Sequence, residues 1–295
     1  MEKSVMFFLS VITIIQSSPV VWRRSLKQKD SSCNNVINFN NKFYSLEEQH
    51  NISGIPADMT VHWKTSRVFF TLISEEMKMN LQILEPNGEL NMIKVSGLGQ
   101  STCVDNLNDI IYLATDNGVY KYKTDLPHEL YTASGDDVMY VAVNSEGTVM
   151  YIATWPQNRV HKITNNGQSQ ELFTAIPNGH GLTVDPKDNI YFVATKTSYV
   201  LKSGFTIPIK IKDLPSDRMT GIFVTRNEDV YAMDEKSNFY IIEPDNTSAR
   251  HLGSFNIKGV NSFAMDANDN VLIGIKGAIF KYTVYDKNPC QQKEK

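Results

Sequence analysis

Alternating apolar and polar residues recur along the chain in units of about forty residues. The units contain short runs rich in β-branched and aromatic residues, such as Tyr112-Leu113-Ala114 and Val141-Ala142-Val143, and period-two alternation of this kind predicts strands. No unit has a 3.6-residue apolar stripe, which disfavours helical repeats. Six apolar-polar pairs, each before a turn-forming segment, occur at intervals of 39 to 43 residues: Val61-His62, Val104-Asp105, Val143-Asn144, Val184-Asp185, Val224-Thr225 and Met265-Asp266.

Each unit is long enough for four short strands. After the turn, a second strand is anchored by an apolar or aromatic residue, and a third strand has such a residue at positions 120, 160, 200, 240 and 280. Turns such as Pro86-Asn87-Gly88 lead into a fourth strand. A repeat of this length is typical of a β-propeller. The sequence therefore predicts an all-β fold, a six-bladed β-propeller with four-stranded blades, over residues 33–290.

The last unit is one strand short. It supplies strands near 262–266, 271–275 and 279–284 and then the chain ends, so the segment from Val36-Ile37-Asn38-Phe39 through Phe43-Tyr44 is the candidate for its fourth strand. Closing the ring with this N-terminal strand would bring Cys33 beside Cys290, and we expect a disulfide between them. Cys103 lies in an apolar strand and is expected to be a buried free thiol.

The N-terminus has the features of a targeting signal. Val5 to Ile15 is an apolar run after a charged start, too short to span a bilayer and suited to a secretory signal. We expect a signal peptide at 1–18, a flexible leader at 19–32 and a charged tail at 291–295. Asn51 and Asn246 are glycosylation acceptors by their sequons. These features predict a secreted, extracellular glycoprotein.

The composition of the chain limits the classes of molecule that it is expected to bind. The chain is 41% hydrophobic and 21% charged with a net charge of −3, and it has no basic stripe of the kind that nucleic acid requires. We expect no nucleic-acid partner, no membrane partner and a monomer.

One face of the propeller collects the candidate binding residues, because the loops that enter the innermost strands and those that join second to third strands lie together. The first set of loops supplies Asp58, Gln100, Ser101, Asp136, Asp137, Tyr140, His180, Arg218, Met219 and Asn261, and the second supplies Asp116, Trp155, Lys196, Glu235 and Lys276. Aromatic area beside cations suits a planar ligand with acidic groups. The residues chosen for ligand binding are Tyr140, Trp155, His180, Lys196, Arg218, Met219 and Asn261.

Most of these residues also have a purely structural interpretation. Trp155 precedes Pro156 and could cover a blade edge, His180 could make an ordinary polar contact, and Tyr140 could belong to the core. Arg218 and Lys196 could be solvated charges. No Gly-x-Ser-x-Gly, His-Glu-x-x-His or Walker motif occurs, and the six histidines lack metal-ligand spacing. The motif survey predicts no enzymatic activity, no cofactor and no metal.

The segment His180-Gly181-Leu182-Thr183-Val184-Asp185-Pro186, followed by Asn189-Ile190-Tyr191, resembles the regucalcin/gluconolactonase and NHL-like six-bladed propellers. The lactonases of that group hold a divalent metal with Glu, Asn and Asp. Here residues 52–61 contain no Glu, His180 takes the place of the Asn, and Thr220 takes the place of the Asp. The resemblance implies a propeller without that metal triad.

The chain is also similar to the ommochrome-binding protein family, secreted haemolymph proteins of moths and butterflies. Phe43-Tyr44-Ser45-Leu46-Glu47-Glu48, Asn51-Ile52-Ser53-Gly54, the repeated units and the terminal cysteine carry this resemblance. It implies a non-catalytic carrier of a planar aromatic acidic molecule, an ommochrome pigment or a tryptophan-derived precursor. The alternatives are a lactonase- or esterase-type hydrolase with an altered or absent metal site, and a protein-interaction scaffold of the NHL kind.

Overall fold

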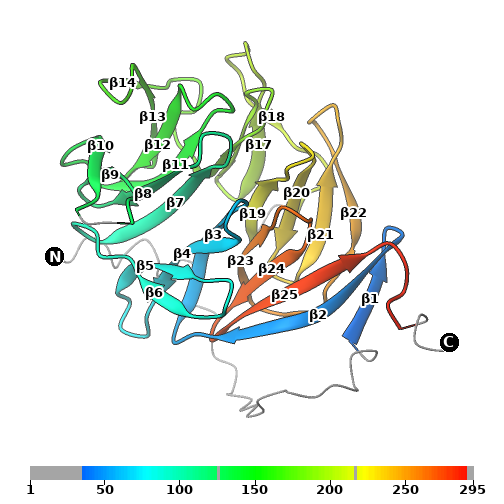
Figure 1. Cartoon of the computed structure of the whole chain (residues 1–295). Coiled ribbons are helices and arrows are strands. Elements are labelled where there is room, and N and C mark those ends of the chain that lie inside the picture. The colour runs from blue at the N-terminus through cyan, green and yellow to red at the C-terminus, as the bar shows by residue number, and fades with distance from the viewer. Residues whose placement is uncertain (1–34, 125–126, 216–217, 291–295) are drawn as a thin grey trace.

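Six antiparallel sheets stand around a common axis (Figure 1). The computed structural model describes residues 35–124, 127–215 and 218–290, which form strands β1 to β25 and no α-helix. No described helix is long and apolar enough to cross a membrane. The predicted signal peptide, leader and tail, together with Cys33, lie outside the described residues.

The first three blades follow one another along the chain, each with strands in consecutive order from the axis outward. Blade 1 contains β3 (Ile55–His62), β4 (Arg67–Ile73), β5 (Met79–Leu84) and β6 (Leu90–Met92). Blade 2 contains β7 (Gly99–Asp105), β8 (Ile110–Thr115), β9 (Gly118–Lys121) and β10 (Glu129–Thr132). Blade 3 contains β11 (Val138–Val143), β12 (Met150–Thr154), β13 (Arg159–Thr164) and β14 (Ser169–Leu172).

The next three blades complete the ring, and each inner strand contacts the inner strands of its two neighbours. Blade 4 contains β15 (His180–Val184), β16 (Ile190–Ala194), β17 (Thr197–Leu201) and β18 (Ile209–Lys210). Blade 5 contains β19 (Met219–Val224), β20 (Val230–Asp234), β21 (Asn238–Ile242) and β22 (Ala249–Ser254). Blade 6 contains β23 (Val260–Met265), β24 (Val271–Ile275) and β25 (Ala278–Tyr285), with β2 (Lys42–Asn51) and β1 (Val36–Phe39) outside them. The predicted six-bladed propeller is confirmed.

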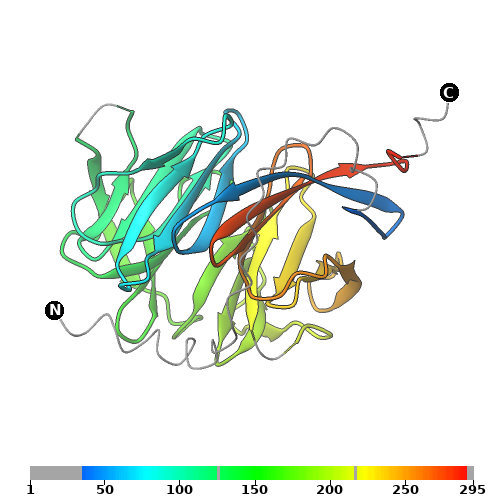
Figure 2. The same ribbon diagram turned by 90° about the horizontal axis from the view of Figure 1, so that it is seen from below.

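The N-terminal segment closes the ring as predicted. β2 pairs antiparallel with β25 from Phe43↔Tyr285 to Asn51↔Ala278, and the two strands run side by side in both ribbon views (Figure 2). The segment forms two strands rather than one, because Asn40 and Asn41 both have positive φ (51° and 57°) in the tight turn of a β-hairpin. β1 is thereby a fifth strand of blade 6.

Three of the six inner strands end at an Asp that begins the following turn: Asp105, Asp185 and Asp266. Asp185 accepts hydrogen bonds from the backbone N–H groups of Lys187 and Asn189 (both 2.9 Å) and from the Asn189 amide (2.8 Å). Asp266 and Asn270 repeat the last of these bonds at 2.8 Å. Asp side chains that bond the backbone two to four residues onward favour such turns. The repeated Asp is therefore a determinant of the fold.

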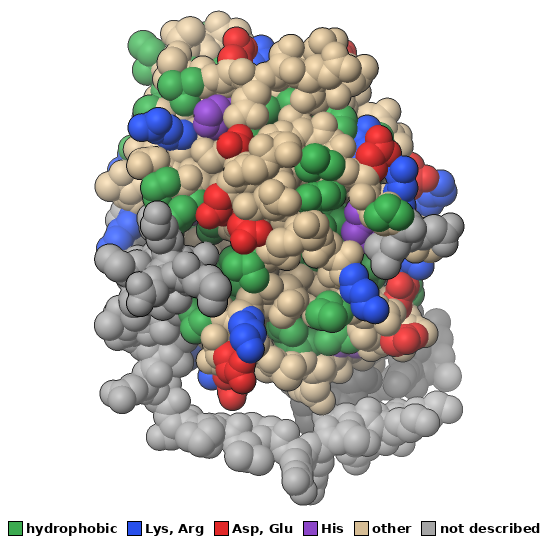
Figure 3. Space-filling view, turned by 90° about the vertical axis from the view of Figure 1, so that its left-hand side faces the viewer, with side chains coloured by type: hydrophobic (Ala, Val, Ile, Leu, Met, Phe, Trp, Pro, Cys, Tyr) green, Lys and Arg blue, Asp and Glu red, His purple; other side chains and the backbone are tan. Residues whose placement is uncertain are grey.

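The outer surface carries charges of both signs. On the side of the molecule shown in Figure 3, lysines, arginines and carboxylates are interspersed and hydrophobic side chains are scattered. Asn51 is exposed at the end of β2, and Asn246 is half-buried in a turn with φ of 58°. Both sequons are thus presented near the surface, and their glycosylation stays a prediction.

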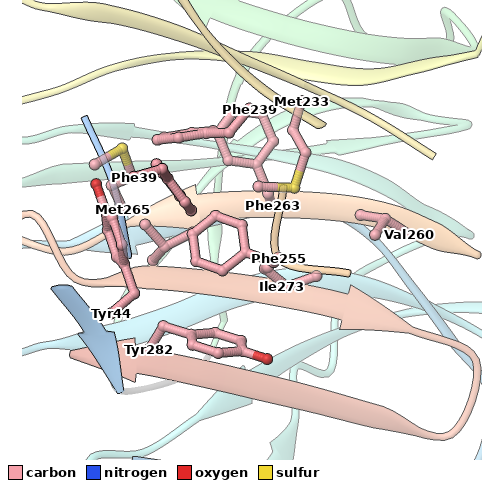
Figure 4. Close-up of a cluster of buried hydrophobic side chains, with 11 residues drawn as sticks. Phe39, Tyr44, Met233, Phe239, Phe255, Val260, Phe263, Met265, Ile273 and Tyr282 are labelled. Atoms are coloured by element: carbon pink, nitrogen blue, oxygen red, sulfur yellow. The ribbon is translucent and has the colours of Figure 1, made fainter. Parts of the chain in front are cut away.

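Aromatic side chains fill the space between blade 5 and blade 6 (Figure 4). Phe239 is fully buried, and its ring centroid lies 4.9 Å from that of Tyr231 and 6.2 Å from those of Phe263 and Phe39. Phe39 belongs to β1, so this cluster connects the N-terminal hairpin to two blades. Aromatic pairs at these separations add to the free energy of apolar burial.

Candidate functional site: the mouth of the central channel

Every inner strand carries an irregularity near its start. A bulge of this kind re-aims side chains and disrupts pairing with the neighbouring strand. In β3 and β15, which lie opposite each other in the ring, the irregular backbone has positive φ at Asp58 (50°) and Gly181 (60°). The register shifts fall between Ala57 and Thr60, Gly99 and Ser101, Val138 and Tyr140, His180 and Thr183, Met219 and Gly221, and Val260 and Ser262.

The six inner strands enclose a channel with a volume of about 1970 Å³. A Cβ atom added at Gly181 would have no atom within 4 Å, so this part of β15 faces open space in the channel. Asp58 lines the channel from β3, Tyr140 from β11 and His180 from β15. The bulged ends of three inner strands therefore direct a carboxyl, a phenol and an imidazole into one space.

Six of the seven ligand-binding candidates from the sequence line this channel. They are Tyr140, His180, Lys196, Arg218, Met219 and Asn261.

Trp155 is the exception and lies outside the residues that line the channel. It is half-buried in the turn between β12 and β13, where its backbone N–H donates to the carbonyl of Asp137 at 2.8 Å. That turn has four residues, and its later members Gln157 and Asn158 reach the channel instead. The prediction placed Trp155 at the mouth because it lies in a loop between a second and a third strand. The length of that loop decides which of its residues faces the channel.

Tyr140 and His180 form the centre of the candidate site. Their ring centroids are 6.0 Å apart with an interplanar angle of 38°. Burial lowers the pKa of His180 below its usual value, because the channel wall disfavours the charged imidazolium. Burial, and then the charge of Asp58, raises the pKa of Tyr140. At neutral pH the site therefore holds a neutral imidazole beside a protonated phenol.

Asp58 is the acidic member of the site. Its carboxylate accepts a hydrogen bond from the backbone N–H of Thr102 at 3.1 Å. Burial nevertheless raises the pKa of Asp58. A non-glycine residue with positive φ is uncommon, and such outliers concentrate where strain serves a function. The sequence placed Asp58 at the mouth without singling it out, because only the bulge shows where its side chain points.

Of the four lysines in the lining, the sequence did not predict two, Lys236 and Lys258. Lys258 lies in the loop that enters β23, the same class of loop that supplies Arg218 to the mouth. That loop class was the signal that could have found it.

Cys103 also lines the channel and is a free thiol. Burial raises its pKa to about 12, so it is held as a neutral thiol. Cys290 is disulfide-bonded; its predicted partner Cys33 lies outside the described residues.

The described residues do not fit the metal site of the lactonases. Among them, no three His, Cys, Asp or Glu side chains gather in a group that could hold a metal ion. Thr220, which stands where the lactonases have Asp, donates its hydroxyl to the carbonyl of Met233 at 2.9 Å. That hydroxyl is therefore occupied by a hydrogen bond within blade 5.

No protein-family model and no curated protein matches the sequence. Among solved structures, a gluconolactonase from Xanthomonas campestris is 8% identical, with a TM-score of 0.66 over 84% of this chain and 91% of that one. The calcium-binding protein regucalcin from Agrobacterium tumefaciens is 12% identical, with a TM-score of 0.61 over 80% and 93%. A catalytically inactive histidine-to-alanine variant of virginiamycin B lyase from Staphylococcus aureus, solved with quinupristin, is 13% identical, with a TM-score of 0.55 over 82% and 88%.

These similarities show the fold and correct one prediction. Two of the three similar structures are of enzymes, a gluconolactonase and virginiamycin B lyase. The prediction of no enzymatic activity, made from missing motifs, is corrected accordingly: this fold is compatible with enzymatic activity. The resemblance to regucalcin-like propellers is confirmed at the level of fold, and nothing in the comparisons supports the ommochrome-binding family.

Proposed function

We propose that the channel is the active site of a lactonase- or esterase-type hydrolase that works without the metal triad. The observation that carries this proposal is the neutral imidazole of His180 beside the phenol of Tyr140 in a channel open to solvent. Titratable groups with shifted pKa values inside a cavity are the usual signature of acid-base chemistry.

His180 is the general base of the proposed reaction. Its lowered pKa keeps the ring unprotonated at neutral pH, and a base with a pKa near or below the working pH is available to accept a proton. Its ring makes no hydrogen bond with any other described residue. The imidazole nitrogens are therefore open to water or substrate in the channel.

Tyr140 is the proposed oxyanion donor. Its raised pKa keeps the hydroxyl protonated, so it can donate a hydrogen bond to the oxygen that gains charge during ester or lactone hydrolysis. After burial, the charge of Asp58 contributes to that raised pKa.

The proposed hydrolysis proceeds through an oxyanion intermediate. A water molecule gives a proton to the imidazole of His180 while its oxygen bonds to the carbonyl carbon. The carbonyl oxygen becomes an oxyanion that accepts the Tyr140 hydrogen bond. The carbon–oxygen bond to the leaving group then breaks, and the imidazolium returns its proton to the departing alkoxide.

Several features predicted from the sequence remain proposals beside this one. We keep a planar aromatic molecule with an acidic group as the substrate class, a secreted extracellular protein and a monomer. The aromatic wall supplied by Tyr140 and the cations of the lining support the substrate class.

The test is turnover of aryl esters and lactones by the purified chain and by matched variants. We expect His180→Gln to lower kcat by at least about 100-fold and Tyr140→Phe by roughly 100-fold or more. The controls are His161→Gln, a half-buried histidine of β13 whose pKa burial also lowers, and Tyr199→Phe, a tyrosine of β17 outside the channel lining.

Both controls should keep wild-type turnover, and a chelator should leave the rate unchanged. Absence of turnover, or equal losses in His180→Gln and His161→Gln, would overturn the proposal.

A further inference from the structure

Charged side chains are distributed unevenly around the mouth of the channel. Blades 4 to 6 contribute cations to its lining: Lys196, Arg218, Lys236, Lys258 and Lys276. Blade 1 contributes Ile55, Ile73 and Met79 at the same end of the inner strands, together with the carboxyl group of Asp58. The mouth therefore has a cationic side and a mostly apolar side, unlike the mixed surface in Figure 3.

Part of this positive charge has no paired carboxylate among the described residues. Arg218 pairs with Glu235 at 2.6 Å, and Lys276 lies 3.8 Å from Glu75. No carboxylate of the described residues lies within 4.0 Å of the ammonium groups of Lys196 and Lys258. Unpaired cations in a concave site attract anions over distances set by the salt concentration.

The backbone that presents Lys196 is a second, independent observation. Thr195 and Lys196 form the two-residue turn between β16 and β17, where Ala194 pairs with Thr197, and their φ values are 48° and 65°. A turn with two positive φ values favours Asn-Gly, and a β-branched residue is an outlier there. Thr-Lys is costly for stability at this position, and both residues lie in the lining of the channel.

We infer that the substrate is an amphipathic anion, with a carboxylate attracted by the charges of Lys196 and Lys258 and an apolar body against blade 1. This inference rests on the proposed function, since it names the class of ester or lactone that the site takes. The anionic end would meet the cations of blades 4 and 6 while the rest of the molecule extends across the ring toward Tyr140 and Ile55.

The experiment compares two esters that differ in one charge, para-acetoxybenzoate and its neutral isostere para-acetoxybenzamide. The measured quantity is the ratio of their kcat/KM values, followed by absorbance of the released phenols. We expect wild type to favour the anion, and Lys196→Gln/Lys258→Gln to lower the ratio by roughly tenfold, because each exposed cation–carboxylate contact contributes up to about a factor of five. Added salt should lower the ratio in wild type as well.

Lys187→Gln is the matched control. Lys187 is an exposed lysine of blade 4 in the turn after β15, at the other end of the channel and outside its lining, so the ratio should stay at the wild-type value. Equal turnover of the two esters, or an unchanged ratio in the double variant, would overturn the anionic substrate while leaving the hydrolase in place.

If neither ester is hydrolysed, calorimetry with the products para-hydroxybenzoate and para-hydroxybenzamide tests the anion site separately from the hydrolase activity. Selective binding of the benzoate that the double variant weakens would sustain the anion site and remove the hydrolase. Equal binding of the two products, or none, would remove the anion site too.

Discussion

A single methyl group can test how the ring is closed. Gly253 lies in β22 of blade 5, against Phe39 of β1, and a Cβ atom at position 253 would lie 2.5 Å from Cγ and 2.6 Å from Cβ of Phe39. Atoms so close to the root of a side chain cannot be relieved by a change of rotamer alone. Gly253→Ala should therefore push β1 away from blade 5.

The magnitudes follow from these contacts. Without the clash, Gly→Ala inside a strand stabilises by roughly 0.5–1 kcal/mol, whereas forcing an extra carbon into a packed core costs about 1–3 kcal/mol. Phe39 is 9% exposed, and truncating such a buried ring costs about 3–5 kcal/mol or more. Phe39→Gly removes both Cγ and Cβ, so in that background the added methyl group has room and Gly253→Ala should change from destabilising to neutral or stabilising.

The assay is reversible urea unfolding of the wild type, both single variants and the double variant, analysed as a double-mutant cycle. We expect a coupling free energy of about 1–3 kcal/mol, with the double variant more stable than the sum of the single changes implies. Gly221→Ala is the control, because its Cβ would lie 3.6 Å from the nearest atom of Phe263, an ordinary contact. Additive single changes would refute the contact between β1 and blade 5.

Three further predictions concern titration, reactivity and glycosylation. Because burial lowers the pKa of His180, activity should rise with pH to a plateau, with a midpoint below about 6.5. In the same pH range the unfolded state binds more protons at His180 than the folded state does, so the stability linked to His180 is present at neutral pH and lost as the pH falls. Urea midpoints of wild type and His180→Gln from about pH 5 to 7 measure this loss. Because burial raises the pKa of Cys103 to about 12, iodoacetamide at pH 8 should label native protein slowly and urea-unfolded protein at least about tenfold faster. Expression through a secretory pathway should add glycans at Asn51 and Asn246 that a glycosidase removes, and Asn51→Gln/Asn246→Gln should migrate as the deglycosylated form on a gel.

The fold was predictable because its determinants repeat in sequence. Val61-His62 ends β3 and Val184 ends β15, as the spacing of the apolar-polar pairs predicted. The missing strand of the sixth unit required the N-terminal segment to close the ring. What the pattern did not resolve was local: the paired positive φ values of Asn40 and Asn41 divide that segment into two strands, and alternation continues through such a turn without a break.

The site was predictable only in part, because side-chain direction at the mouth depends on register and loop length. His180 and Tyr140 were found from their places at the start of inner strands. Asp58 was named among the mouth residues but its role was not, since a bulge reverses the alternation that assigns side chains to a face. Trp155 was misplaced because its turn is four residues long, and the short turn at Lys196 left no such ambiguity.

The bulges are the places where this fold can change its chemistry. Each blade is held by apolar contacts between sheets, such as those of Phe239. Three blades also have an aspartate in the turn after the inner strand, at the far end from the mouth: Asp105, Asp185 and Asp266. At the mouth, His180 lines the channel and Thr220 bonds within its own blade, and these two residues stand where lactonases carry metal ligands. Under the proposed function, differences between the six bulges, rather than any single motif, determine what the channel binds and transforms.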